Sequence, residues 1–183
     1  GIARDLAAAG VGVLKPLDTE PVPGGFDSPI KVHLDFPPES ADACPYFAGR
    51  LIRGVSNADS PDWVKERLNS IGLRPISALV DITNLLTIEL GRPLHVFDAD
   101  KIEGDIHVRL ARPGETITAL DGKDYEMDGE MTVIADEAQA LALGGVMGGE
   151  HSGCTPETTN VYLESALFDP RRTAATGRNL NLM

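Results

Sequence analysis

Cysteine and aromatic residues are scarce in this chain. Its 183 residues include two cysteines and one tryptophan, and aromatic residues make up only 5%. Cys44 and Cys154 lie far apart and form no CxxC pair, so they indicate free thiols in a reducing compartment. The histidines are scattered, and neither an HExxH motif nor paired cysteines accompany them. The sequence therefore predicts no structural metal site.

Positive charge is scarce as well. The 16 Lys and Arg residues are outnumbered by 28 Asp and Glu residues, which gives a formal net charge of −12 at pH 7. A nonspecific nucleic-acid binder usually carries a basic face, so this class is disfavoured. A site that takes only the tip of a nucleic acid held by another module stays open. No apolar run reaches the roughly 18 residues of a membrane span, and residues 1–6 do not resemble a signal peptide.

Hydrophobic periodicity and turn residues predict an α+β fold with mixed, largely antiparallel sheets and helices packed to one side. The length suits one domain or two small ones. A proline-rich arm is expected over 16–29, and Ser60 is expected to cap a helix that begins near Asp62. The predicted strands cover 30–36, 46–55, 106–110, 116–120, 124–127, 131–135, 140–146 and 161–166, and the predicted helices cover 1–9, 61–71, 76–90 and 169–180.

The most unusual segment is residues 144–153, which read Gly-Gly-Val-Met-Gly-Gly-Glu-His-Ser-Gly. It has neither the Gly-Lys-Ser/Thr ending of a phosphate loop nor the GxGxxG spacing of a dinucleotide site. Glycine is costly inside regular structure, so the segment needs another explanation. Two remain: a tight bend or bulge between strands, or backbone that approaches a ligand closely.

Some polar residues can be explained either by an ordinary structural role or by a role in function. His95 follows a helix in a short loop, where it is either a solvent-facing or capping residue or a polar contact and proton carrier. Thr83 and Asn84 interrupt an apolar helical pattern, either on its wet face or hydrogen-bonded to a ligand. Glu164 shares a strand face with Tyr162, and that face is either solvated or buried. A buried Glu164 would need a donor, such as a substrate hydroxyl.

Several motifs occur in a characteristic order: Arg53-Gly54-Val55, Trp63–Leu73 with Arg74-Pro75, Leu79–Asn84, Glu89–Asp98, the glycine segment and Leu163–Ala166. Together they resemble the central editing region of the β subunit of bacterial phenylalanyl-tRNA synthetase. The resemblance covers essentially the whole chain, and residues 1–8 are similar to the end of the preceding module. We therefore expect residues 1–40 to be the end of that module with a linker arm, and 41–183 to be the editing domain, truncated at its C-terminal part.

The resemblance implies a domain that hydrolyses tyrosine wrongly esterified to tRNA(Phe). A synthetic site for phenylalanine cannot strongly reject an isostere with one added hydroxyl, so a second, hydrolytic site is needed. In the family, a buried glutamate that matches Glu164 accepts the tyrosine hydroxyl. Phenylalanine would leave this carboxylate unpaired.

The resemblance also implies the other pocket residues. Those that match family residues lining the pocket are His95, Arg74, Thr83 and Asn84, and Gly145 and Gly148 match glycines that leave room for the aminoacyl end. Catalysis is expected from His95, Asn84 and Thr83, with amides of the glycine segment holding the water and the ester. No covalent nucleophile is expected, because Cys154 and the serines lack a visible base partner.

Cofactors and partners follow from the same resemblance. It implies no cofactor in this domain, whereas the parent enzyme would use ATP and magnesium at a site in its other subunit. The implied partners are the α subunit of an α2β2 heterotetramer, the aminoacylated 3′ end of tRNA(Phe) and tyrosine, with no membrane and a cytoplasmic location. Two alternatives stay open: a non-catalytic module that positions tRNA, and a free-standing hydrolase of other aminoacyl esters.

Overall fold

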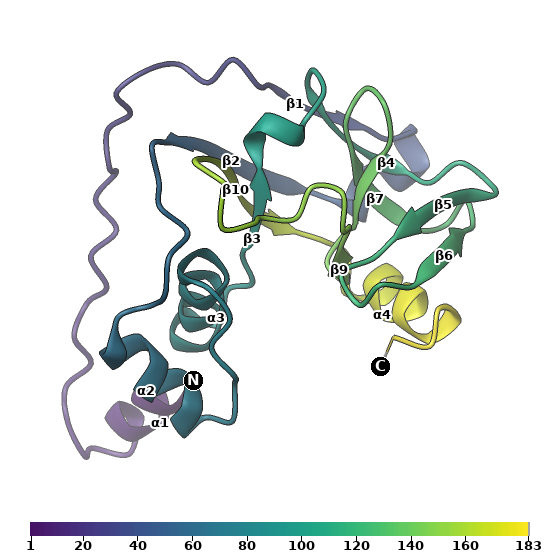
Figure 1. The fold of residues 1–183 in the computed structure, drawn as a ribbon. Helices are drawn as coiled ribbons and strands as arrows, with labels where there is room; N and C mark the ends of the chain where they lie inside the picture. Colours follow the sequence, from purple (N-terminus) through teal and green to yellow (C-terminus); the bar gives the residue numbers. More distant parts are fainter. Residues whose placement is uncertain (183) are drawn as a thin grey trace.

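The computed structural model describes residues 1–182 as three sheets with helices beside them (Figure 1). The five-stranded sheet has the order β1-β4-β7-β8-β9, in which β1 and β4 run parallel and the other neighbours antiparallel. The three-stranded sheet β2-β10-β3 is antiparallel, and β5 and β6 form a hairpin. The strands are β1 (Val32–Asp35), β2 (Tyr46–Arg53), β3 (His95–Asp98), β4 (Ile106–Leu110), β5 (Glu115–Thr118), β6 (Asp124–Met127), β7 (Thr132–Ala135), β8 (Ala140–Leu143), β9 (Met147–Gly148) and β10 (Asn160–Leu167).

The helices begin and end at local signals. Asp169 caps α4, because its side chain accepts hydrogen bonds from the backbone N–H groups of Arg171 and Arg172. Gly91 ends α3 in the left-handed conformation (φ 67). The helices are α1 (Ile2–Ala8), α2 (Asp62–Ser70), α3 (Ala78–Leu90) and α4 (Pro170–Asn179), with short 3-10 helices η1 (Pro38–Ala43) and η2 (Ala99–Lys101). The expected α+β class is confirmed, and no helix within residues 1–182 has the length and apolarity to cross a membrane.

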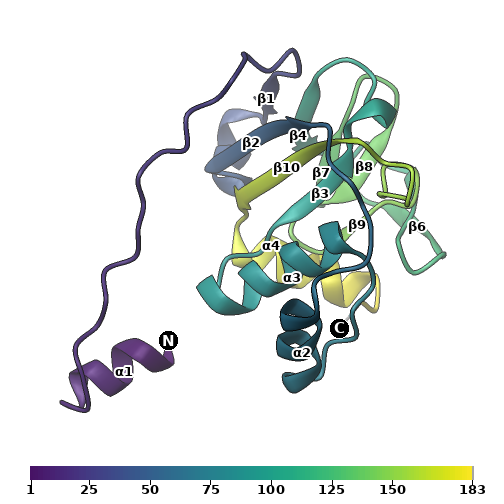
Figure 2. The same cartoon turned by 60° about the vertical axis from the view of Figure 1, so that its left-hand side comes forward.

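An exposed arm connects α1 to β1. Figure 2 shows α1 separated from α2 and α3, with the arm running along the outside of the domain. Near its end the arm contacts β2, where Arg50 Nη2 donates to the Val22 carbonyl (2.5 Å) and the Arg53 guanidinium lies 4.7 Å from the Phe26 ring centroid. β1 precedes the boundary predicted at residue 40 and already belongs to the five-stranded sheet.

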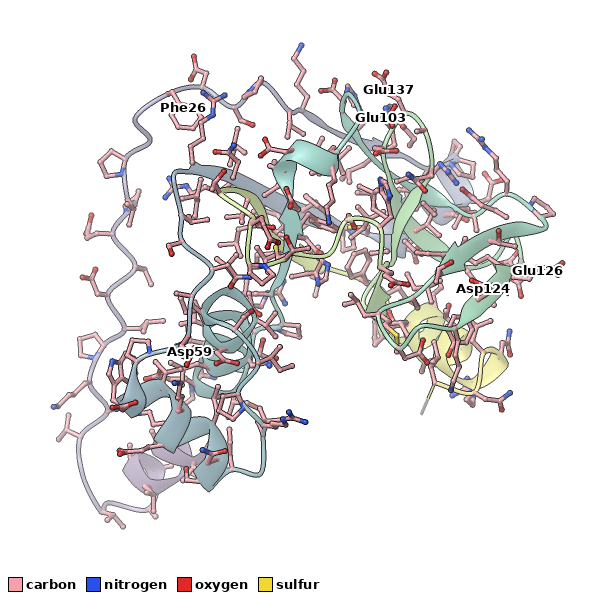
Figure 3. All side chains as sticks on the ribbon, viewed as in Figure 1. Phe26, Asp59, Glu103, Asp124, Glu126 and Glu137 are labelled. Carbon is pink, nitrogen blue, oxygen red and sulfur yellow. The ribbon has the colours of Figure 1, made fainter. Side chains whose placement is uncertain are left out.

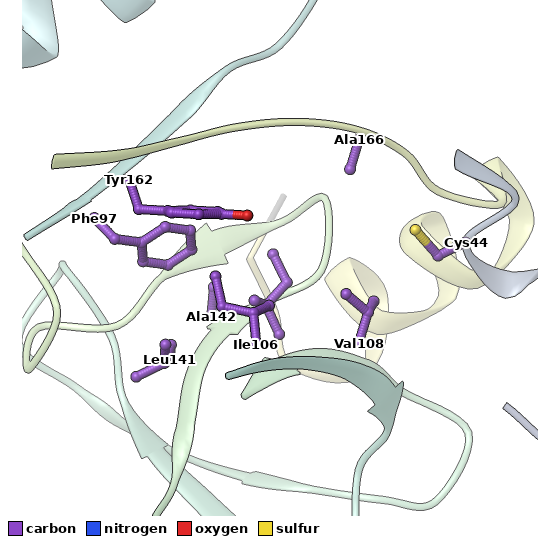
Figure 4. Close-up of a cluster of buried hydrophobic side chains, with 9 residues drawn as sticks. Cys44, Phe97, Ile106, Val108, Leu141, Ala142, Tyr162 and Ala166 are labelled. Carbon is purple, nitrogen blue, oxygen red and sulfur yellow. The ribbon is translucent and has the colours of Figure 1, made fainter. Parts of the chain in front are cut away.

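The hydrophobic core lies between the two larger sheets (Figure 4). Phe97 and Tyr162 project from the three-stranded sheet toward Ile106, Val108 and Leu141 of the five-stranded sheet. A second cluster joins the β5–β6 hairpin to β7 and β8, and the end of α4 packs against it. Burial of apolar area on both sides of the five-stranded sheet therefore fixes where the hairpin and α4 lie.

The capping role expected for Ser60 is wrong. Pro61 is the N-cap residue of α2, and no side chain caps this helix. The Ser60 hydroxyl instead donates to Asp81 Oδ2 (2.6 Å), and Asp81 Oδ1 accepts from the Ile76 backbone N–H (2.8 Å). Asp81 is only 1% exposed, so its carboxylate must find hydrogen-bond donors within the protein, whereas water can bond the exposed N–H groups at the start of α2. The hydroxyl thus ties the start of α2 to α3.

Gly49 of β2 leaves room for the buried ring of Tyr162. A Cβ atom at Gly49 would lie 1.8 Å from the Tyr162 hydroxyl oxygen and 2.3 Å from Cζ of that ring. Tyr162 is 2% exposed and has no free space into which it could move. Gly49 is also the residue of β2 that pairs with Glu164, so no side chain of β2 projects beside the carboxyl group at this position.

Gly49→Ala is expected to lower the free energy of unfolding by about 1–3 kcal/mol through overpacking against Tyr162. Thermal and urea unfolding measure the change. Gly129→Ala is the matched control, because its nearest neighbour would be 3.7 Å from the new Cβ atom. Equal stability of the two variants would contradict the packing described for Gly49.

Candidate functional site

A cavity of about 650 Å³ lies where β3, the end of β10, the glycine segment and the start of α4 meet. Its wall is mostly apolar and includes Leu120, Val146 and Phe168. Arg92, His95 and Glu164 also line it, and they are its titratable side chains within the described part of the chain. A concave apolar site with a few convergent polar groups is typical of a pocket that binds a small molecule or a small substrate group.

Glu164 faces inward. Tyr162, Glu164 and Ala166 alternate along β10 and are 2%, 7% and 8% exposed, so this face of the strand is buried rather than solvated. Burial raises the pKa of the Glu164 carboxyl to about 7, and the nearby positive charge of Arg92 opposes this rise. No group within residues 1–182 donates a hydrogen bond to this carboxyl group, and its oxygens are not among the fully enclosed atoms, so they reach the cavity, from which a donor can come.

His95 stands directly opposite Glu164. The two residues pair across the antiparallel strands β3 and β10, which places both side chains on the same face of the sheet. The imidazole packs edge-on against Phe97, with ring centroids 4.5 Å apart. Its Nε2 atom is buried and has no hydrogen-bond partner among the described residues. Burial lowers the pKa of His95 to about 4, so the ring is neutral at pH 7.

The glycine segment is both a turn and a wall of the cavity. β8 ends at Leu143, earlier than the strand predicted over 140–146, because the chain turns at Gly144 and Gly145 (φ 71 at Gly145) and returns as β9. Gly145 and Gly148 both line the cavity. A Cβ atom at Gly148 would lie 2.4 Å from His95 Cε1 and 2.7 Å from Nε2. The absence of a side chain at Gly148 therefore leaves the space that the imidazole ring of His95 occupies.

Four of the seven predicted site residues meet at the cavity: His95, Gly145, Gly148 and Glu164. Arg74, Thr83 and Asn84 do not line it. Arg74 is exposed in the loop between α2 and α3, the Thr83 hydroxyl donates to the Val80 carbonyl (2.8 Å), and Asn84 is half-buried. Asn84 lies six residues before the end of α3, which is about 9 Å along the helix axis.

The cavity also has lining residues outside the predicted set, among them Arg92, Leu120, Phe168 and Thr173. For Arg92 a sequence signal exists, because it stands three residues before His95 in the motif Glu89–Asp98. Leu120 belongs to the β5–β6 turn, and Phe168 and Thr173 flank the start of α4. Their approach depends on how these elements pack, for which the sequence carries no short-range signal.

Most of the acidic residues that outnumber the basic ones lie outside the cavity. Figure 3 labels exposed examples at the periphery: Asp59, Glu103, Asp124, Glu126 and Glu137. Within residues 1–182, no three His, Cys, Asp or Glu side chains are grouped so as to hold a metal ion. The negative charge is thus spread over the outer surface, while the cavity contains one carboxyl group and one guanidinium group.

Comparison with known proteins identifies the family. The model of the B3/4 domain matches residues 43–183. The chain belongs to the B3/4 domain family. Over its full length it is 66% identical to the phenylalanine–tRNA ligase β subunit of Paramagnetospirillum magneticum and 57% identical to that of Cereibacter sphaeroides. It spans 23% of the length of each relative, and the family predicted from the motifs is confirmed.

The fold of this B3/4 domain also has a counterpart among solved structures. It resembles the crystal structure of an N-terminal fragment of the phenylalanyl-tRNA synthetase β subunit from Pyrococcus horikoshii with a TM-score of 0.60. The match covers 88% of this chain and 49% of that fragment at 15% sequence identity. At this identity the likeness supports the fold alone, and it agrees with the mixed antiparallel architecture described above.

Glu164→Gln is expected to stabilise the folded chain at alkaline pH. The pKa of Glu164 rises from 4.5 to about 7 on burial, so the unfolded chain loses its proton first and stability falls as the pH rises between these values. This cost is on the order of 3 kcal/mol above pH 7. Unfolding measured from pH 4 to pH 8 should show a flatter pH dependence for Glu164→Gln than for the exposed control Glu157→Gln. Parallel curves would contradict the burial of an ionisable Glu164.

Gly148→Ala is expected to displace the His95 ring, since the new methyl group would overlap Cε1 and Nε2. A displaced ring gains access to water, and its pKa should rise from about 4 toward its ordinary value of 6.5. Titration of the imidazole followed by NMR measures this change, again with Gly129→Ala as the control. An unchanged titration of His95 would show that Gly148 does not confine the ring.

Proposed function

We propose that this B3/4 domain hydrolyses tyrosine that has been wrongly esterified to tRNA(Phe). The observation that carries the proposal is the pair of the buried Glu164 and the partly buried His95, whose Nε2 atom is enclosed, side by side on one wall of an apolar cavity. Relatives named as phenylalanine–tRNA ligase β subunits supply the biological context. In that context a second site is useful, because a pocket for phenylalanine rejects tyrosine only weakly.

Glu164 selects the substrate by its need for a donor. The tyrosine hydroxyl would donate to the carboxylate and restore the hydrogen bonding that burial removed. A phenylalanyl group would fill the same space but leave the carboxylate desolvated and unpaired. Such a mismatch costs at least about 1–3 kcal/mol, or roughly ten- to hundred-fold in affinity.

His95 and the glycines position the group that reacts. Because His95 lies directly across from Glu164, a tyrosyl group bound through its hydroxyl would run past the imidazole. The neutral ring can donate or accept a hydrogen bond at Nε2, and we assign it the orientation of the attacking water or of the terminal ribose. Gly145 and Gly148 leave room for the aminoacyl end, and backbone amides of the segment would stabilise the developing oxyanion.

Hydrolysis then needs no covalent intermediate. Water attacks the ester carbonyl, the bond to the ribose oxygen breaks, and free tyrosine and tRNA(Phe) with a restored 3′-terminal hydroxyl are released. No thiol lines the cavity within the described residues, and Cys44, which lies in the neighbouring hydrophobic core, has a pKa raised to about 11 by burial and does not serve as a nucleophile at neutral pH. Thr83 and Asn84 would join catalysis only after α3 approached the ester, a movement that substrate binding would have to drive.

The rest of the parent enzyme would deliver the substrate. The net charge of −12 suits a domain that receives only the aminoacylated end, with phosphate contacts made by other modules. We propose that the chain acts in the cytoplasm within a β subunit, next to an α subunit that carries the ATP- and magnesium-dependent synthetic site. A domain that binds tyrosine but does not deacylate Tyr-tRNA(Phe) would instead be a positioning module.

In the intact synthetase, Glu164→Gln should slow deacylation of Tyr-tRNA(Phe) by at least about ten-fold at pH 8, because a neutral amide is a weaker acceptor than a carboxylate. Wild-type deacylation should fall as the pH drops below about 7, where Glu164 becomes protonated. Rates for Tyr-tRNA(Phe) and Phe-tRNA(Phe) measured from pH 6 to pH 9 test both points, with Glu157→Gln as the control. A wild-type rate in Glu164→Gln would remove Glu164 from substrate selection.

A further inference from the structure

Arg92 is fixed at the edge of the cavity by an unusual hydrogen bond. It follows Gly91, which ends α3 with a left-handed turn toward β3. Its Nη2 atom donates to the carbonyl of Ala166 on β10 (3.0 Å). Arg92 and Ala166 both line the cavity, and Ala166 lies on the same strand face as Glu164.

The pairing of β10 with β3 explains why a side chain makes this bond. The strands pair from Val161 opposite Asp98 to Glu164 opposite His95. Continuing this register by two residues would place Pro93 opposite Ala166, and proline has no N–H to donate. The guanidinium of Arg92 takes over the missing donation, so its position follows from the end of the strand pairing.

Arg92 is also the cation near Glu164, because both residues line the cavity and the charge of Arg92 lowers the pKa of this carboxyl group. The other titratable groups around this carboxyl are neutral at pH 7: the pKa of His95 is lowered to about 4, and burial raises those of Cys44 and Tyr162 to about 11 and about 12. The cavity wall formed by α4 and the glycine segment contributes no titratable side chain within the described residues. Ionisation of Glu164 against its burial is therefore favoured by one neighbouring charge, that of Arg92.

We propose that Arg92 is a specificity-determining positioning residue, whose tethered positive charge keeps Glu164 in the form that accepts a tyrosyl hydroxyl. The inference rests on the proposed function of the cavity and extends it to a residue outside the predicted set. Arg92 acts through Glu164 and through the carbonyl of Ala166, and it contacts no reacting atom. An arginine suits both tasks, because its rigid guanidinium carries a permanent charge and directed donors.

The test compares Arg92→Gln, which keeps a side-chain donor but loses the charge, with Arg92→Lys, which keeps the charge. In the intact synthetase, Arg92→Gln should move the pH midpoint of Tyr-tRNA(Phe) deacylation from about 7 to about 8. The rate at pH 7 then falls about five-fold, and it recovers by pH 9. Arg92→Lys should keep a midpoint close to that of the wild type. An equal loss at every pH with an unchanged midpoint would reveal a merely structural role and overturn the proposal.

Binding of free L-tyrosine separates this inference from the proposed function. Calorimetry on the intact synthetase, with Glu164→Gln subtracting tyrosine bound elsewhere, should show affinity falling below about pH 7 in the wild type and below about pH 8 in Arg92→Gln. This shift without any deacylation of Tyr-tRNA(Phe) would refute hydrolysis while leaving the role of Arg92 in tyrosine selection intact. Wild-type deacylation with identical midpoints in both proteins would refute the role of Arg92 alone.

Discussion

A carboxyl group buried in the middle of a strand is the constraint on which the rest of this structure depends. Glu164 is 7% exposed and lacks a hydrogen-bond donor within the described residues, so its oxygens are left to the cavity that it lines. The neighbours are arranged accordingly. Gly49 places no side chain beside it on β2, His95 occupies the opposite strand, and Gly148 makes space for the imidazole. The two glycines remove bulk and the neutral His95 adds no charge, which leaves the cavity as the place where a donor can enter.

The buried carboxyl of Glu164 costs stability, and the proposed function gives that cost a use. A carboxyl whose pKa is raised by burial weakens the folded state at neutral and alkaline pH, and an apolar or amide side chain would not. In the proposed function, the same desolvation would let the carboxylate discriminate between two substrates that differ by one hydroxyl, since an exposed carboxylate would be satisfied by water in either case. In the proposed role of Arg92, its charge would lower the cost of ionising Glu164 while its guanidinium stays bonded to the Ala166 carbonyl.

Local sequence signals predicted most elements of the fold, but they did not predict which face of a strand would be buried. The strand predicted over 106–110, the neighbouring strands predicted over 116–120 and 124–127, and the helix predicted to end at residue 90 all follow from patterns a few residues long, and the structure has β4, the β5–β6 hairpin and the end of α3 there. Alternation placed Tyr162 and Glu164 on one face, yet only the packing of two sheets decides that this face is buried. The position of Asn84 relative to the cavity depends likewise on where α3 docks, and a motif match carries no information on that distance.

The glycine segment shows why two explanations of one sequence feature need not exclude each other. A turn between β8 and β9 requires the left-handed conformation at Gly145, which alone would justify one glycine. It does not explain Gly148, which lies in a strand and has no turn to make. The Gly148 backbone lies against the imidazole of His95, and there the absence of a side chain matters for the site rather than for the fold. The turn between β8 and β9 returns the chain along β8 and thereby places the backbone of Gly148 at the cavity. The same segment is therefore both a turn and part of the cavity wall.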